Sequence, residues 1–287
     1  MRDFSGGVAH LSLNTATVRK QLGLLEIIDA CAQRGITTIC PWRDQVHAAG
    51  LAATARRLAD AGIGTSGYCR GGFFTGVDAA ARKAALEDNR IAIDEAKTVN
   101  APCLVLVVGA LPGALAGKPL SKDIGLARAQ VVDGIAASLD YARKVGMPLA
   151  IEPLHPMQGA DRACVNTLGH ALDICDALDP GRTCALGVAL DVYHTWWDPQ
   201  LEAQIKRAGR DRLLGYHVCD WLVPTRDLLN DRGMMGDGIV ELKKVRGWVE
   251  AAGYTGPAEV EIFSESWWSR PADEVLDTCV DRHQTVV

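Results

Sequence analysis

Four residues whose side chains can bind a metal ion each stand at the end of a short apolar run: Glu152, Asp191, His217 and Glu261. Charged and imidazole side chains seldom end a buried strand without a partner, so four of them in phase with four runs indicate one shared site. Three carboxylates and one imidazole suit a hard or borderline divalent ion, with Mn²⁺ the first expectation and Mg²⁺, Co²⁺ or Zn²⁺ as alternatives. Metal-assisted catalysis is the chemistry that this set predicts.

The apolar runs belong to a series of strand-like segments that alternates with helix-like segments along the chain. The strand-like segments are 8–13, 36–40, 64–69, 103–108, 148–152, 185–191, 213–218 and 258–262. They are short and continuously apolar, which is typical of parallel strands covered on both faces. The helix-like segments are 17–34, 51–61, 78–99, 123–145, 167–178, 199–208, 239–252 and 272–280.

Eight such βα units, with no Pro- or Ser-rich linker between them, predict a single domain over residues 1–287, folded as a (β/α)8 TIM barrel. In this fold the carboxyl ends of the strands form one rim, where the active site lies. The four metal-type residues follow the fifth to eighth strands and would therefore meet at that rim. A doubly wound open sheet is the alternative, but no G-x-G-x-x-G or Walker-type loop follows the first strand.

The composition predicts a cytoplasmic protein that acts on small molecules. A net charge of −5 argues against nucleic acid or an anionic membrane as the main partner. The nine cysteines are odd in number and scattered, with no C-x-x-C pair, which indicates small buried hydrophobic residues in a reducing compartment. The N-terminus has no apolar leader, and glycines and a proline interrupt the longest apolar stretch, residues 101–117.

Several motifs surround the four metal-type residues: Glu152-Pro-Leu-His155-Pro, Asp191-Val-Tyr-His194, Tyr216-His217-Val-Cys-Asp220, Glu259-Val-Glu261 and Asp231-Arg-Gly-Met-Met-Gly-Asp-Gly238. With these motifs the chain resembles, over nearly its whole length, the xylose-isomerase-like superfamily of sugar isomerases and epimerases, a TIM-barrel group that also contains endonuclease IV. The resemblance implies that Glu152, Asp191, His217 and Glu261 bind one divalent ion, often manganese. It also implies that His194 contacts substrate and that the two glutamates transfer a proton on opposite faces of a keto sugar.

The implied mechanism agrees with the chemistry of these residue types. Removing a proton next to a carbonyl creates an enediolate, and a divalent ion on the carbonyl and adjacent hydroxyl stabilises its negative charge. One carboxylate can remove the proton and a second can return it, which gives epimerisation or aldose–ketose exchange. We therefore expect a divalent-metal-dependent isomerase or epimerase of a keto sugar or keto-polyol, with Glu152 and Glu261 as catalytic residues.

His155 leaves a second reaction open, because it lies on the loop after the fifth strand, just beyond Glu152. An imidazole there could act as an acid or base that expels a leaving group. The same enediolate would then lead to β-elimination, as in a dehydratase or a 3-keto-glycoside deglycosidase. A loop histidine held by a backbone carbonyl is the alternative interpretation.

Other residues at the rim are expected to contact the substrate, a small sugar or keto-glycoside. Imidazole and guanidinium groups can hold substrate oxygens, tryptophans can form a wall for a sugar ring, and a carboxylate can bind hydroxyls. The residues expected in these roles are His194, Arg162, Trp197, Asp220 and Trp42. No basic cluster is evident along the chain, which favours an unphosphorylated substrate. Tryptophan is also favoured at subunit interfaces. We therefore expect a homo-oligomer, and a complex with a second, smaller subunit is the alternative.

Two other classes of protein compete with this interpretation. Apurinic endonucleases share the barrel but hold three ions, with further histidines after the third and fourth strands. This chain has Tyr68-Cys69-Arg70 and Val108-Gly109-Ala110 at those places and an acidic net charge, which argues against DNA cleavage. A non-catalytic binding protein would have to keep unsatisfied acids at its rim without an ion, which is costly.

Overall fold

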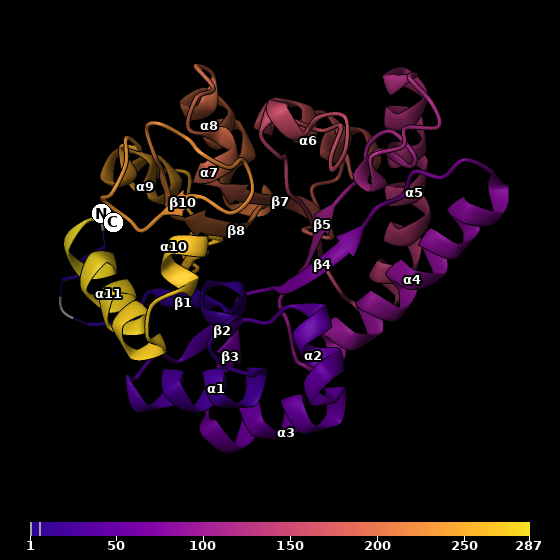
Figure 1. Ribbon diagram of the computed structural model, residues 1–287. Helices are drawn as coiled ribbons and strands as arrows, with labels where there is room; N and C mark the ends of the chain where they lie inside the picture. The colour runs from indigo at the N-terminus through magenta and orange to yellow at the C-terminus, as the bar shows by residue number, and fades with distance from the viewer. Residues whose placement is uncertain (1, 6) are drawn as a thin grey trace.

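The computed structural model describes residues 2–5 and 7–287. Nine parallel strands form a nearly closed barrel, and the helices surround it (Figure 1). The strands are β1 Leu11–Asn14, β2 Thr38–Cys40, β3 Gly64–Thr65, β4 Tyr68–Gly72, β5 Leu104–Val107, β6 Leu149–Ile151, β7 Leu186–Asp191, β8 Leu213–Val218 and β11 Ala258–Val260. The predicted TIM-barrel fold is confirmed.

The third predicted strand is divided in two, which gives the barrel nine strands. β3 pairs with β2 and β4 pairs with β5, and residues 66 and 67 lie between the two pieces. The sheet therefore runs in the order β3-β2-β1-β11-β8-β7-β6-β5-β4. A further bridge between Trp42 and Cys69 connects the chain beyond β2 to β4. The two ends of the sheet are thus joined through the third strand itself.

The outer helices agree closely with the predicted segments, and their ends follow from side-chain capping. Asp78, Asp123 and Thr167 accept hydrogen bonds from the first turns of α4, α5 and α6. Gly62 and Gly146 end α3 and α5 in the left-handed conformation, which glycine adopts without steric cost. These long helices are α1 Leu24–Gln33, α3 Leu51–Ala61, α4 Ala79–Thr98, α5 Ile124–Val145, α6 Leu168–Leu178, α8 Leu201–Arg212, α9 Leu242–Ala251 and α11 Ala272–Thr285.

The predicted helix 17–34 is shorter than expected. Residues 15–18 form a separate 3-10 turn, η1 Thr15–Val18, and α1 begins only at Leu24, where the Glu26 carboxylate accepts the N–H of Gly23 at 2.8 Å. Several short elements were not anticipated, and most of them lie in loops at the carboxyl ends of strands. They are α2 Arg43–Ala49, α7 Val192–Thr195, α10 Glu265–Trp268, η2 Ala114–Ala116, η3 Pro156–Gln158 and the antiparallel pair β9 Asp220–Trp221 with β10 Arg232–Gly233.

The cysteines take the structural role that the sequence predicts, since all nine are free and only Cys184 is exposed. Cys40, Cys69 and Cys103 pack inside the barrel against Ala150 and Ala189. These side chains are small, so they fill the interior of the barrel and still leave space for the site at its rim. No helix within residues 2–5 and 7–287 has both the length and the apolar character needed to cross a bilayer.

A buried ion pair joins the outer helices α6 and α8 behind β7. Arg212 is fully buried and donates to the Asp179 carboxylate at 2.7 Å and to the Leu186 carbonyl at 2.7 Å. We predict that Asp179→Ala lowers the free energy of unfolding by about 2 kcal/mol, because the buried Arg212 then keeps only the partly exposed Asp176, at 3.3 Å, as an acidic partner. Urea denaturation checks this, with Asp173→Ala as the control. Asp173 pairs with Arg207 at the exposed surface, so its loss should cost less than about 1 kcal/mol, and equal costs would contradict the prediction.

Candidate active site

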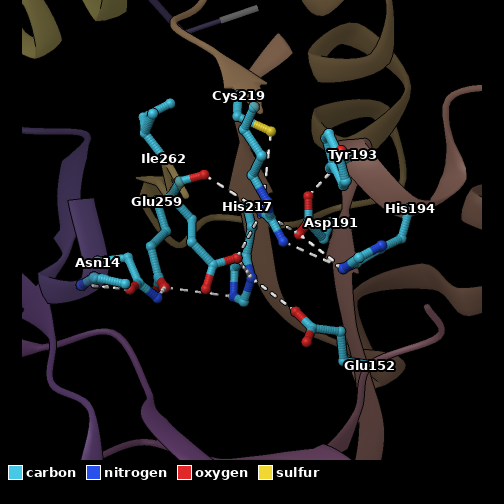
Figure 2. A network of polar contacts seen from close by, with 12 residues as sticks. Asn14, Glu152, Asp191, Tyr193, His194, His217, Cys219, Glu259 and Ile262 are labelled. Atoms are coloured by element: carbon cyan, nitrogen blue, oxygen red, sulfur yellow. Dashed lines mark hydrogen bonds and ion pairs between the residues drawn. The ribbon is translucent and has the colours of Figure 1, made fainter. Parts of the chain in front are cut away.

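The four metal-type residues meet at the carboxyl ends of four neighbouring strands. Glu152 follows β6, Asp191 ends β7, His217 lies in β8 and Glu261 follows β11, and these strands are consecutive in the sheet. One ligand atom from each residue lies within 4.8 Å of the others, and all four side chains are buried. Figure 2 shows Glu152, Asp191 and His217 facing one another across this space. The structure therefore brings together the set that the sequence singled out.

The donor atoms fit a divalent cation. His217 Nδ1 lies 3.1 Å from Glu152 Oε1 and 3.6 Å from Glu261 Oε2. Within the described chain neither Nδ1 nor Oε1 has a hydrogen-bond partner of normal geometry. Buried polar atoms left in this state are costly unless something else satisfies them. A divalent ion among three carboxylates and one imidazole nitrogen would do so, and no other group of three or more such residues occurs in residues 2–5 and 7–287.

Glu259 holds the far side of the His217 ring. Its carboxylate lies 3.6 Å from His217 Nε2 and accepts hydrogen bonds from Asn14 Nδ2 at 2.8 Å and Ser66 Oγ at 2.7 Å (Figure 2). A carboxylate behind a metal-binding imidazole fixes the ring and raises its basicity. Glu259 and Glu261 are two residues apart on one strand, so both face the barrel interior. That spacing is visible in the sequence, but Glu259 was not singled out there.

The electrostatics of the buried set favour an ionised Asp191. Burial raises the pKa of Asp191, but the charge of Arg232 and a hydrogen bond from the backbone N–H of Tyr193 hold the pKa below its usual value. Burial likewise opposes the charged form of His217, yet the surrounding carboxylates, Glu259 foremost, raise its pKa well above the usual value. The negative charge of this set therefore attracts a cation, whether a proton or a metal ion.

Arg232 is a site residue that sequence reasoning missed. It lies on β10, in the loop after β8, and its guanidinium Nη1 donates to Asp191 Oδ2 at 2.8 Å and to Glu261 Oε2 at 3.0 Å. The side chain is buried and stacks over Tyr193. The only signal in the sequence was its place within the 231–238 motif, since nothing in the spacing showed that this loop folds back over the barrel.

Asp220 supports the loop that carries Arg232. It is buried, and its carboxylate accepts the backbone N–H groups of Trp221, Gly236 and Val240, each at 2.9 Å. Gly238 packs against the same carboxylate, because a Cβ there would meet Asp220 Oδ1 at 2.6 Å. Both oxygens of Asp220 are thus occupied by backbone, and the residue does not line the cavity as expected. Its position favours a structural role over the expected contact with a substrate hydroxyl.

A cavity of about 200 Å³ opens beside the metal-type residues. Glu152 and Glu261 line it together with His194 and Arg232. Trp42 and Phe263 add apolar surface, with their rings 5.3 Å apart and roughly perpendicular. The Nε1 of Trp42 also donates to Asn14 Oδ1 at 2.7 Å, which fixes the ring. Two carboxylates and an aromatic wall around one small space are suited to a sugar-sized molecule.

The expected family is shown by comparison with known proteins. A family model described as xylose isomerase-like TIM barrel matches residues 28–280. The chain belongs to this family. In the xylose isomerase-like family, the inosose isomerase of Halalkalibacterium halodurans is 26% identical to this chain over 217 residues, which are 75% of this chain and 72% of that protein.

Solved structures agree with the family assignment. Protein SMc04130 from Sinorhizobium meliloti 1021 is 57% identical and has a TM-score of 0.92, with 97% of this chain and 98% of that chain covered. The crystal structure of the IolI protein with a zinc atom bound is 19% identical, with a TM-score of 0.80 over 97% of this chain and 99% of that chain. At 19% identity the likeness shows the fold alone.

His194 lies at the cavity of this xylose isomerase-like protein with both ring nitrogens in contact with neighbouring groups. Its Nδ1 accepts the backbone N–H of His155 at 3.1 Å, and its Nε2 lies 3.3 Å from Arg232 Nη2 and 3.6 Å from Asp191 Oδ2. Burial lowers the pKa of His194 to about 3, which keeps the ring neutral near pH 7. His194 therefore lines the cavity beside the metal-type set, where the resemblance implies a contact with substrate.

His155 lies next to the cavity rather than among the residues that line it. Its ring stacks on Trp221 at 4.8 Å, and Trp197 meets it edge-on at 5.9 Å. Its Nδ1 accepts the N–H of Met157 at 3.3 Å, and burial lowers its pKa. Trp197 is likewise absent from the cavity wall and donates its Nε1 to the His194 carbonyl at 2.8 Å. Arg162 and Trp42, in contrast, line the cavity as expected.

Binding of a divalent ion should depend on pH. In the metal-free protein, burial raises the pKa of Glu152 to about 7, with the charge of Glu261 adding to the effect. A bound ion must displace this proton below pH 7, and must displace the proton of His217 wherever that ring is charged. We predict that the Kd for Mg²⁺ rises as the pH falls, about tenfold more steeply per pH unit below pH 7 than above it. Calorimetry in buffers of different ionisation heat measures both Kd and released protons; Glu152→Gln should release about one proton fewer. A Kd independent of pH would contradict the prediction.

Proposed function

We propose that this protein is a divalent-metal-dependent isomerase or epimerase of a keto sugar or keto-polyol, acting through an enediolate. The observation that carries the proposal is the placement of two buried carboxylates, Glu152 and Glu261, at one cavity with Asp191 and His217. The similarity to inosose isomerase supports a cyclic or open-chain keto-polyol as substrate. The acidic cluster is suited to Mn²⁺, with Mg²⁺, Co²⁺ or Zn²⁺ as alternatives.

The residues of the chain divide the reaction between them. When bound by Glu152, Asp191, His217 and Glu261, a divalent ion would supply positive charge that favours an anionic substrate oxygen. Of the two catalytic glutamates, one removes the proton next to the carbonyl and the other returns it. His194 lies on the cavity wall, where it would contact a substrate oxygen and so orient the reacting carbon.

Arg232 contributes a fixed donor in this mechanism. Its guanidinium lies over Tyr193 at 4.5 Å, which keeps it in place within a buried site. The charge of Arg232 lowers the pKa of Asp191 and so keeps this ligand carboxylate ionised. Burial of the site excludes bulk water, so each of these charges acts more strongly on the substrate than it would at the surface.

A metal-dependent lyase is the second candidate, because His155 lies beside His194 and could serve a leaving group. The lowered pKa of His155 and its Nδ1 contact with Met157 both favour the neutral ring, which is a weak acid. This weighs in favour of the isomerase. We expect His155→Ala to reduce an isomerase activity less than about tenfold, because the backbone N–H that holds His194 is retained. It would reduce a lyase activity by at least about a hundredfold. Met157→Ala, on the exposed part of the same loop, is the control.

Proton NMR in D₂O with the Mg²⁺-loaded enzyme tests the proposal. The substrates are ketohexoses, keto-inositols and 3-keto-glycosides. Deuterium next to the carbonyl, with the substituents retained, is the result expected of an isomerase or epimerase. Loss of water or of an aglycone would establish the lyase instead. Exchange at the same rate without a divalent ion would contradict the proposed metal dependence.

A further inference from the structure

Three arginines besides Arg232 line the cavity that holds Glu152 and Glu261. Arg19 follows η1, Arg70 lies within β4, and Arg162 lies on the loop after β6. No basic cluster is evident along the sequence, so this grouping was not anticipated. The arginines are far apart along the chain, and only closure of the barrel brings them to one rim.

Arg70 has no acidic partner, unlike most arginines around it. Arg19 pairs with Asp44, and Arg43 pairs with Asp88 at 2.9 Å. No hydrogen bond or ion pair of the Arg70 side chain occurs in the part of the chain that the structure describes. Its guanidinium instead stacks over Phe73 at 4.3 Å. Stacking occupies the face of the group and leaves the five N–H donors at its edge available.

Arg162 is the second cavity arginine without an acidic partner among the described residues. It is partly buried, as Arg70 is, and the two positive charges are close enough to affect each other. Burial lowers the pKa of Arg70, and the charge of Arg162 lowers it further. Two partly buried cations that face one cavity, neither of them in an ion pair among the described residues, repel each other. An anion between them would remove this cost.

Gln158 adds a polar atom on the same side of the cavity. It lies in η3, on the loop that carries Arg162, and is only 5% exposed. Its Oε1 is buried without a hydrogen-bond partner in residues 2–5 and 7–287. An unsatisfied buried acceptor that lines a cavity points to a ligand group that donates to it, so Gln158 would hold a hydroxyl of the same ligand beside its oxyanion.

We propose that the substrate of this enzyme carries a negatively charged oxyanion, a carboxylate or a phosphate, which Arg70 and Arg162 bind. This inference rests on the proposed function and specifies its substrate class as an acidic keto sugar or acidic keto-polyol. The guanidinium fork matches both oxyanions, because two parallel N–H groups meet two oxygens. Glu152 and Glu261 line the same cavity, so the substrate would place its oxyanion at the arginines and its reacting carbon at the glutamates.

The test compares three sugars that differ only in the group at carbon 6, which is neutral in D-glucose and charged in D-glucuronate and D-glucose 6-phosphate. Calorimetry with the Mg²⁺-loaded enzyme should show that at least one charged sugar binds at least about tenfold more tightly than glucose. A preference for glucuronate identifies a carboxylate site, and a preference for the phosphate identifies a phosphate site. Added salt should weaken binding of the charged sugars only.

Variants assign this preference to the two arginines. Arg70→Gln and Arg162→Gln should each lower the affinity for the preferred charged sugar by about tenfold to a hundredfold and leave glucose unaffected. Arg56→Gln, on the exposed face of α3, is the matched control and should change nothing. Arg70→Lys, which keeps the charge but loses the fork, should recover part of the affinity. Unchanged thermal unfolding shows that each variant is folded.

The proposal is overturned if neither charged sugar binds more tightly than glucose, or if tighter binding survives both substitutions. The proposed function can fail separately from this inference. If a neutral keto-inositol exchanges deuterium normally in the wild-type enzyme and the charged sugars show no preference, the enediolate mechanism stands and the oxyanion site is wrong.

Discussion

Replacing Glu261 or Glu152 by glutamine should lower turnover by at least about a thousandfold without unfolding the protein. Glutamine has nearly the same shape but cannot accept the substrate proton, and general acid–base catalysis accounts for factors of about 10² to 10⁴. Both side chains are buried at the cavity, so no water is placed to replace them. Steady-state kinetics on the substrate found by NMR measures the effect.

A matched variant separates this effect from a general loss of charge near the site. Glu265→Gln changes an exposed glutamate in the first turn of α10, close to Glu261 in the chain. It should retain full turnover. Metal content measured on each variant shows whether the loss comes from the missing base or from a missing ion. Full activity in either Glu152→Gln or Glu261→Gln would remove the proposed mechanism.

Removing the divalent ion should abolish activity and lower the melting temperature while leaving the protein folded. Arg232 already donates to Asp191 and Glu261, so it can balance part of their charge when no ion is present. The ion binds the folded state alone, and at a free concentration one hundred times its Kd it adds about 2.7 kcal/mol of stability. Calorimetry before and after chelation measures the shift, and elemental analysis confirms removal.

Adding back the ion identifies the native metal and tests the ligand set. Mn²⁺ should restore activity best, with Mg²⁺, Co²⁺ and Zn²⁺ compared at the same pH. Asp191→Asn should not be restored by any of them at concentrations that suffice for the wild type, because it removes one of three ligand charges. Full activity in protein shown to be free of metal would contradict the metal site.

The barrel and its metal-type set could be predicted because both depend on local patterns. A short apolar run that ends in Glu, Asp or His shows where a buried strand meets the rim. Because consecutive strands are neighbours in the barrel, the residues at their ends are expected to lie close together. Glu152, Asp191, His217 and Glu261 were found in this way without knowledge of any distance. The starts of the helices after Asp123 and Thr167 could be predicted in the same way, because helix capping depends on a few adjacent residues.

Other features could not be predicted because long-range packing determines them. Arg232 reaches the site only when β10 pairs with β9, and Asp220, expected to bind substrate, instead holds that loop. Arg70 shows the same limit, since it looks like an ordinary arginine in the sequence, whereas Arg162 was expected at the site from its place on the loop after the fifth strand. Loops that fold back over a barrel have no periodic pattern, so their residues are assigned to the site only in three dimensions.

The measurement that tests the central claim most directly is deuterium exchange at the carbon next to the carbonyl, followed by proton NMR in D₂O. The wild-type enzyme is compared with and without Mg²⁺ on one keto substrate, alongside Glu261→Gln. We predict rapid exchange in the Mg²⁺-loaded wild type and none above background in the other two samples. Exchange that persists at the wild-type rate in Glu261→Gln or in metal-free enzyme would contradict proton transfer by a metal-supported carboxylate pair.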